Sequence, residues 1–191
     1  MTGIHTVLVD KIIEFIMRDF MEEEVRVEVI GGNFRVLTHE GFIDLVRGAE
    51  YNLPRWIAYE LLKKGIVNIK SDNISVEKLS SIAYNEESTI GRPEFVKVPR
   101  YFYLLVKKEI EEIREKLSKN ADINLLQELK TYEDLIYTIG KIRLKKILYI
   151  LLLPQIPQEI LDKLSEEEKT LLNLLKSSLN VWMKSLRIEK H

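Results

Sequence analysis

The sequence of 191 residues contains no cysteine, which excludes disulfides and metal sites built from thiolates and fits an intracellular protein. Histidine, another common metal ligand, occurs only three times. His5, His39 and His191 lie far apart in the sequence, two of them near the termini. We therefore expect neither a bound metal ion nor another cofactor.

Long hydrophobic runs are missing as well. The longest run, residues 147–153, is far shorter than the ~20 apolar residues of a helix that spans a bilayer. Near the N-terminus, charged residues interrupt the apolar stretch that a signal peptide would need: Asp10, Lys11, Glu14, Arg18 and Asp19. The sequence thus predicts neither a membrane span nor a signal peptide.

Recognisable catalytic motifs are also absent, including glycine-rich nucleotide loops, the paired-histidine zinc motif and the serine nucleophile elbow. Gly31 and Gly32 precede a predicted strand instead of a helix, so we interpret them as a turn and not as a phosphate loop. The acidic runs at 22–24 and 166–168 are interpreted as a solvated linker and a helix N-terminus. We expect no enzyme activity, and a small enzyme with an unrecognised site stays open as an alternative.

Neither sign of charge dominates, because 29 basic and 30 acidic side chains give a net charge of −1. This balance gives no overall electrostatic reason to expect strong nucleic-acid binding, although a basic patch can exist locally. Hydrophobic residues make up 46% of the chain, which is enough for a packed core and argues against global disorder.

The N-terminal part of the chain has the pattern of a helix followed by strands. Residues 7–21 form an amphipathic stripe, typical of a helix packed on its own domain or of one that binds a partner. Alternating apolar and charged residues predict a strand over 25–30, and a turn at 31–33 leads into a second strand over 34–37. A third strand is predicted over 42–46.

Residues 52–64 have the pattern of a complete helix. Asn52 is the predicted N-cap, and Pro54 suits the first turn. Gly65 is predicted to end the helix in the left-handed conformation, and a strand over 66–69 follows. The apolar stripe of this helix is formed by Trp56, Ile57, Leu61 and Leu62.

Near Asp72 the hydrophobic period changes from about 2 to about 3.6 residues, and we place a domain boundary there. A small β-rich domain at 1–72, with its N-terminal helix, then precedes an α-helical domain at 73–191. The predicted fold class is therefore α+β. Helices are predicted over 75–84, 101–117, 122–153 and from 166 to about 186, with a polar loop over 85–91. Ser165 and Glu168 form a predicted capping box at the start of the last helix.

The end of the long helix, residues 147–153, is apolar on every side, so it must be buried on all sides. In a small bundle such burial often requires another subunit, and we therefore expect an oligomer. The candidate interface residues are Leu135, Ile139, Ile147, Leu148, Ile150, Leu151, Leu175 and Trp182. Substitution of Ile147 or Leu151 by Asp is expected to disrupt assembly or folding.

The same helix carries a basic cluster, with no acidic residue after it until Glu159. The candidate contact patch is Lys141, Arg143, Lys145 and Lys146. It is interpreted either as a solvated face or interface rim, or as a contact to DNA phosphates that would add affinity but no sequence information.

The domain order and several hydrophobic motifs resemble those of the GINS family of replication proteins. The motifs are Leu-Pro-Arg-Trp-Ile-Ala at 53–58, Leu-Leu-Lys-Lys-Gly-Ile-Val at 61–67, Arg-Leu-Lys-Lys-Ile-Leu at 143–148 and Leu-Ser-Glu-Glu-Glu at 164–168. A β domain before the helical domain is similar to the archaeal subunit related to the second and third Psf-type subunits of eukaryotes. The resemblance covers about residues 25–187, so the helix at 7–21 lies outside it.

The resemblance implies a non-enzymatic scaffold subunit of the replication fork, in the cytoplasm of a prokaryotic cell. Such a subunit is expected to form a hetero-tetramer with a sister GINS subunit. The complex would bridge and activate the MCM replicative helicase together with a RecJ-like or Cdc-type partner, with weak or indirect DNA contact.

A winged-helix DNA-binding regulator is the alternative, because a helix, a glycine and a strand follow one another in that fold as they do at 61–69. A winged helix, however, has its helices before its wing and needs a basic recognition helix. Here strands come first, and the helix carries only Arg55, Lys63 and Lys64 against Glu60. We therefore favour the scaffold.

Overall fold

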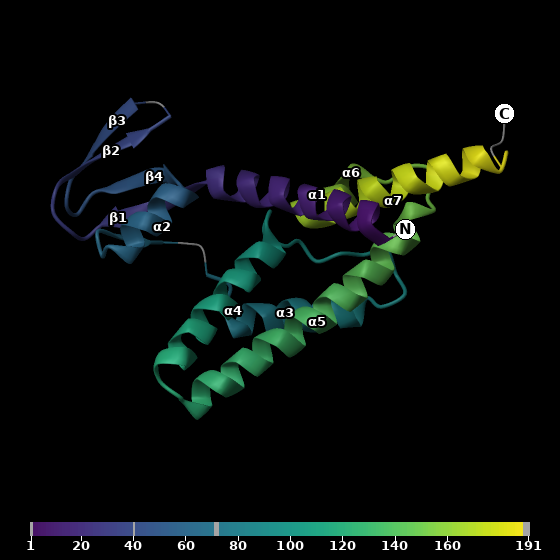
Figure 1. Cartoon of the computed structure of the whole chain (residues 1–191). Coiled ribbons are helices and arrows are strands. Elements are labelled where there is room, and N and C mark those ends of the chain that lie inside the picture. The colour runs from purple at the N-terminus through teal and green to yellow at the C-terminus, as the bar shows by residue number, and fades with distance from the viewer. Residues whose placement is uncertain (1, 40, 71–72, 189–191) are drawn as a thin grey trace. The chain divides into compact units, whose positions relative to one another are not determined.

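The computed structural model describes residues 2–39, 41–70 and 73–188, and side chains from residue 9 onward within these ranges (Figure 1). Contacts divide the chain into two units, residues 1–73 and residues 74–191. The first unit holds the described strands and the second is helical, which confirms the predicted α+β fold class. Asp72, where the domain boundary is predicted, and His191 lie outside the described residues.

In the first unit, β1 (Glu24–Val29) is the central strand of an antiparallel sheet with the order β4-β1-β5. Its neighbours are β4 (Glu50–Pro54) and β5 (Val67–Ile69). A separate antiparallel hairpin is formed by β2 (Phe34–Thr38) and β3 (Gly41–Leu45). The four strands that the sequence predicts are all present, each with ends within one residue of the prediction.

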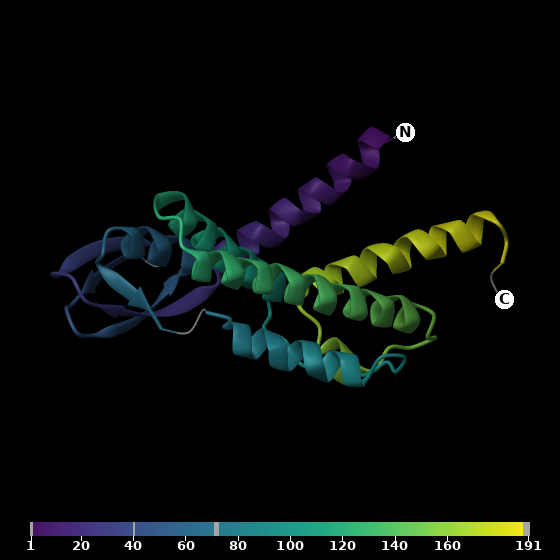
Figure 2. The same ribbon diagram turned by 90° about the horizontal axis from the view of Figure 1, so that it is seen from below.

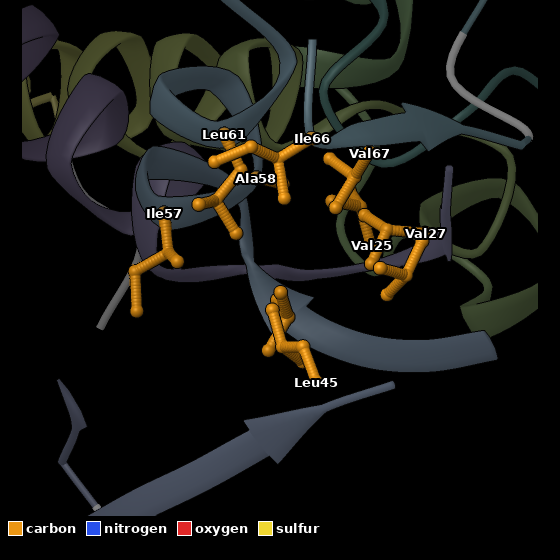
Figure 3. Close-up of a cluster of buried hydrophobic side chains, with 10 residues drawn as sticks. Val25, Val27, Leu45, Ile57, Ala58, Leu61, Ile66 and Val67 are labelled. Carbon is orange, nitrogen blue, oxygen red and sulfur yellow. The ribbon is translucent and has the colours of Figure 1, made fainter. Parts of the chain in front are cut away.

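The core of this unit lies between the sheet and α2 (Arg55–Lys63), as Figure 3 shows. Alternation along β1 turns Val25 and Val27 toward the core, where they meet Val67 of β5. From α2, Ile57, Ala58 and Leu61 complete the cluster, and Leu45 of β3 is fully buried with them. Trp56, which we placed in the same apolar stripe, is instead 42% exposed.

Strand β4 was not predicted, and the predicted start of α2 is wrong. Asn52 pairs with Arg26 in the ladder between β4 and β1 instead of capping a helix. The helix begins at Arg55, with Pro54 at the N-cap position. Asn and Pro are typical of helix starts, but they are also tolerated in a short edge strand, and here the pairing with β1 decides. The predicted end is confirmed, because Gly65 has φ +66° just after the helix.

Helix α1 (Thr2–Glu22) is held to α2 at its C-terminal end. Arg55, 2% exposed, donates from Nε to the Phe20 carbonyl oxygen (3.0 Å) and from Nη2 to the Glu23 carboxylate (2.6 Å). Its guanidinium also lies 4.1 Å from the centroid of the Phe20 ring. Further toward the N-terminus, Ile13 and Met17 are exposed. Among the described side chains of α1, those at its C-terminal end pack on its own unit.

The second unit is built from α3 (Val76–Ser88), α4 (Phe102–Lys119), α5 (Ile123–Leu151), α6 (Gln158–Leu161) and α7 (Glu166–Ser185). Ser75 caps α3, and Ser165 and Glu168 form the predicted capping box of α7. The predicted polar loop over 85–91 is wrong at its start, because α3 continues to Ser88. The additional turn contains Glu86, which lies on the buried side of α3.

Helices α4 and α5 form an antiparallel hairpin, and α3 packs along α5 (Figure 2). The start of α7 contacts both α4 and α5, while its C-terminal part projects beyond the other helices of the unit. Between α5 and α7 lies a buried cluster whose members are Phe95, Ile147, Ile150, Leu164 and Leu172. In the described part of the chain, no helix is both long and apolar enough to cross a membrane.

Candidate subunit interface

Three of the candidate interface residues are buried within the helical unit itself. Ile139, Ile147 and Ile150 on α5 are at most 1% exposed, so their burial needs no other subunit. Leu151 and Leu175 are half-buried against the same cluster, and Leu135 is half-buried on α5. The expectation that burial at the end of α5 requires a second chain is therefore wrong for Ile147 and Ile150, while an interface role of the half-buried candidates stays a prediction.

Leu148 and Trp182 are the two candidates that face solvent, with exposed fractions of 46% and 56%. Leu148 is part of an exposed row with Leu144 on α5 and Leu152 at its C-cap, spaced at four residues and therefore on one side of the helix. Trp182 lies on the projecting part of α7. Other exposed apolar residues near it in the sequence are Val181, Leu186 and Ile188. We call Leu144, Leu148, Leu152 and Trp182 the exposed apolar set.

A groove of about 240 Å³ between α4, α5 and α7 adjoins this set. Its walls are formed by Tyr103, Gly140, Leu144, Ile147, Glu167, Glu168 and Leu171. Glu167 accepts a hydrogen bond from the Leu104 amide on Oε1 (3.1 Å), whereas its buried Oε2 has no partner in the described residues. Burial raises the pKa of Glu167, which weakens its preference for the charged form. The groove is thus mostly apolar, and one of its two carboxylates has a buried oxygen without a hydrogen-bond partner among the described residues.

The basic cluster on α5 does not form a single surface patch. Arg143 is fully buried and makes a two-pronged ion pair with Glu168 on α7, from Nε to Oε1 (2.6 Å) and from Nη2 to Oε2 (2.7 Å). Its Nη1 donates to Glu86 of α3 (2.5 Å) and to the Val96 carbonyl oxygen (2.8 Å). One guanidinium therefore ties three segments of the unit together.

Lys146 completes the same buried ion-pair cluster. Its ammonium, on a side chain 4% exposed, donates to the Glu86 carboxylate (2.5 Å), to the Thr89 hydroxyl (2.7 Å) and to the Glu94 carbonyl oxygen (2.8 Å). Phe95 lies close to both cations, with its ring centroid 5.2 Å from the Arg143 guanidinium carbon and 5.9 Å from the Lys146 ammonium. Only Lys141 and Lys145 of the predicted patch remain exposed.

The cluster satisfies its charges internally. Burial on its own lowers the pKa of Arg143, but the hydrogen bonds and charge of Glu168 outweigh it, so the pKa is raised overall. The Tyr103 hydroxyl donates a hydrogen bond to Glu168 (2.8 Å). Burial raises the pKa of this tyrosine most, and the negative charge of Glu168 raises it further. The cluster therefore pairs the basic side chains of Arg143 and Lys146 with the acidic side chains of Glu86 and Glu168, and the raised pKa keeps Tyr103 neutral at neutral pH.

A family model described as the Sld5 GINS complex protein helical bundle domain matches residues 68–187, which is more than half of the chain. The chain belongs to the GINS family. Its match contains α3 to α7 and therefore the buried ion-pair cluster, the groove and the exposed apolar set. No curated protein matches the chain at a significant level.

Within this GINS helical bundle, the motif at 143–148 has an internal role that we did not predict. Ile139, Arg143, Lys146 and Ile150 follow one another at three- and four-residue steps, so the two cations lie in the buried stripe of α5. This spacing was a usable signal for burial. The identity of the partners was not, because Glu86 and Glu168 lie 57 and 25 residues away from Arg143.

The carboxylates that the structure describes in this GINS chain do not assemble into a metal site. Among the residues that the structure describes, no group of three His, Cys, Asp or Glu side chains could hold a metal ion. Of the acidic run at 166–168, Glu168 belongs to the ion-pair cluster and Glu167 to the groove. In the run at 22–24, Glu23 pairs with Arg55.

Proposed function

We propose that this chain is a non-enzymatic scaffold subunit of a GINS complex that acts in chromosomal DNA replication. The proposal rests on a contrast within the helical unit. Its buried charged side chains are paired with one another, whereas large apolar side chains remain exposed on its surface. Arg143, Lys146 and their partners satisfy one another inside the bundle, yet Leu148 and Trp182 stay in solvent. Burying a side chain of this size contributes about 2 kcal/mol, so covering both would favour the binding of a partner.

The partner that covers this surface, in our proposal, is a sister GINS subunit, and the assembled complex is a hetero-tetramer. Family membership supports the assembly, and the exposed apolar set supports the location of the contact. The set lies on two different helices, α5 and α7, so it suits a helical partner that packs against both.

We further propose that the complex bridges and activates the MCM helicase together with a RecJ-like or Cdc-type partner, in the cytoplasm of a prokaryotic cell. Its DNA contact is proposed to be weak or indirect. Two of the four basic side chains of the predicted contact patch form internal ion pairs, and the net charge of the chain is −1. A continuous cationic surface, which tight phosphate binding requires, is therefore not supplied by this helix.

The test is sizing with light scattering of the chain alone and mixed with a sister GINS subunit. A complex of defined mass is expected. Leu148→Glu and Trp182→Ala should each weaken it at least about tenfold, because truncating or charging a buried anchor costs about 1.4 kcal/mol or more. The matched control is Leu126→Glu, at an exposed leucine (53%) near the start of the same helix. Equal binding by all variants would contradict the assigned surface.

The absence of any complex would contradict the scaffold itself. In that case duplex DNA binding is measured next across a salt series. Tight binding with a steep salt slope would favour the DNA-binding regulator instead. The helicase link is tested separately, by adding MCM to the purified complex and measuring both co-elution and DNA unwinding, which should rise only when the complex is present.

A further inference from the structure

A second surface of the helical unit, on α5 and the loop that follows α3, carries a pocket that the assembly proposal does not use. The pocket has a volume of about 230 Å³ and is lined by Ile90, Gly91, Arg92, Ile142, Lys145, Lys146 and Tyr149. None of these residues belongs to the exposed apolar set.

The floor and walls of this pocket are apolar. Ile142 is 8% exposed and forms part of the floor. Lys146 sends its ammonium inward to Glu86 and Thr89, so it offers the pocket its methylene stem. Ile90 and Tyr149 are exposed by 61% and 56% and form the walls. Large apolar side chains that stand open around a cavity are typical of a site that takes an anchor residue of a partner.

The rim of the pocket is cationic. Lys145 is exposed and has no ion-pair or hydrogen-bond partner among the described residues. The Arg92 side chain is 70% exposed, and its nearest carboxylate, Glu94, is 4.0 Å away and 60% exposed, a weak surface pair. No acidic residue occurs on α5 after Asp134, so the helix itself does not neutralise this rim. An incoming negative charge would therefore be attracted.

We infer that this pocket binds an acidic peptide segment of another protein, with one aromatic or branched apolar side chain as its anchor. The anchor fills the space between Ile90 and Tyr149, and carboxylates on either side of it face Lys145 and Arg92. Charge complementarity selects the acidic segment, and the apolar lining selects a protein over a nucleic acid, whose phosphates would find few donors inside the pocket.

The probe is a synthetic eight-residue peptide of Glu and Asp with one central Phe, labelled with a fluorophore and titrated with the full-length chain. Binding is followed by fluorescence anisotropy up to millimolar protein. Two companion peptides are titrated in the same way: one has Ala in place of Phe, and the other has Lys in place of the acidic residues. A duplex DNA of similar charge is the fourth probe.

The acidic Phe peptide is expected to bind at least about tenfold more tightly than either companion, and to weaken as salt is raised. Tyr149→Ala and Lys145→Glu should each weaken it by about fivefold or more. The matched controls on the same helix are Tyr137→Ala, at an exposed tyrosine (69%), and Lys130→Glu, at an exposed lysine about 22 Å along the helix from Lys145. Both should bind as the unchanged chain does.

Binding that Tyr149→Ala leaves unchanged would overturn the inference, as would the absence of saturable binding by the acidic Phe peptide. Equal binding of the Ala companion peptide would contradict the role of an apolar anchor. Tighter binding of the DNA would show that the cationic rim binds phosphates instead of a peptide. Circular dichroism of each variant shows whether the fold is kept. The peptide is tested on the chain alone, so a failure here is distinct from a failure to assemble with a sister subunit.

Discussion

Arg143 on α5 and Glu168 in the first turn of α7 are joined by two parallel hydrogen bonds of 2.6 and 2.7 Å, with both side chains at most 3% exposed. Glu168 has a second task, because its Oε2 also accepts the Ser165 amide of the capping box (3.0 Å). The start of α7 is thereby fixed to the middle of α5 by the same carboxylate that caps it.

Replacement of Arg143 by Met is expected to destabilise the helical unit by about 3–5 kcal/mol, because Glu168 and Glu86 would lose a buried cation. Urea unfolding followed by circular dichroism measures the loss. The control is Arg114→Met, because Arg114 forms an exposed ion pair with Glu133. Its expected effect is below about 1 kcal/mol.

The double variant Arg143→Met with Glu168→Met should lose less stability than the sum of the two single variants, since neither charge is then left alone. Strict additivity would show that the two side chains do not act as a pair. A loss for Arg143→Met no larger than that of Arg114→Met would contradict the buried cluster altogether.

Ile147 and Leu148 are neighbours in the sequence, but Ile147 is buried in the core and Leu148 is exposed. Substitution of each by Asp should therefore have different effects. Ile147→Asp places a charge in the core, where the side chain is 1% exposed, and should cost several kcal/mol or prevent folding. Leu148→Asp is at a 46% exposed position and should change stability by less than about 1 kcal/mol. It should nevertheless weaken binding of a sister subunit.

The two readouts for this pair are the urea midpoint and the mass of the mixed complex by light scattering. Stable folding of Ile147→Asp would contradict the position of Ile147 in the core. Normal assembly by Leu148→Asp would move the subunit contact away from this row of α5.

Tyr132 gives the helical unit a dependence on alkaline pH. Its hydroxyl donates to the Ile74 carbonyl oxygen (2.8 Å), and burial raises its pKa from 10.0 to about 12. A raised pKa in the folded state means that the contribution is complete below pH 10 and is lost as the pH rises through 12. The stability difference between the unchanged chain and Tyr132→Phe should therefore shrink between these values.

This difference is measured from urea midpoints at a series of alkaline pH values, with Tyr137→Phe as the control at an exposed tyrosine (69%). The control should show no such change. A difference for Tyr132→Phe that stays constant with pH would show that the hydroxyl titrates normally and is not buried in solution.

Local patterns in the sequence predict much of this fold because they depend on neighbouring residues. Alternation gives β1, the Ser165 and Glu168 pair gives the start of α7, and Gly65 gives the end of α2. Strand β4 was missed because Asn52 and Pro54 carry a helix-start signal that only pairing with β1 overrides. Tertiary contact, not local preference, decides that segment.

The candidate site shows the same division. Periodicity correctly puts Ile139 and Ile147 on one side of α5, but it cannot tell whether another chain or this one covers that side. Here Leu164 and Leu172 of the same chain pack with Ile147. The positive charges of Arg143 and Lys146 were also misleading, because basic side chains usually lie on the surface. Here they are buried because they pair with carboxylates of residues distant in the sequence. Family membership is visible in the motifs, but the function of each motif residue required the fold.

Two glycines with opposite backbone conformations provide a last prediction. Gly140 lies inside α5, and a methyl group added there would meet only the Tyr103 ring at 3.8 Å, an ordinary contact. Gly140→Ala should therefore stabilise the helical unit by about 0.5–1 kcal/mol, because alanine loses less backbone freedom on folding. Gly65 has φ +66°, so Gly65→Ala should destabilise the first unit by about 1–2 kcal/mol.

Each unit has its own tryptophan, Trp56 in the first and Trp182 in the second, so fluorescence can follow the two unfolding events separately. In a Trp56→Phe background, Gly140→Ala should raise the urea midpoint that Trp182 reports and Gly65→Ala should leave it unchanged. A shift of that midpoint by Gly65→Ala would mean that the two units unfold together. A fall caused by Gly140→Ala would mean that Tyr103 cannot accommodate the methyl group.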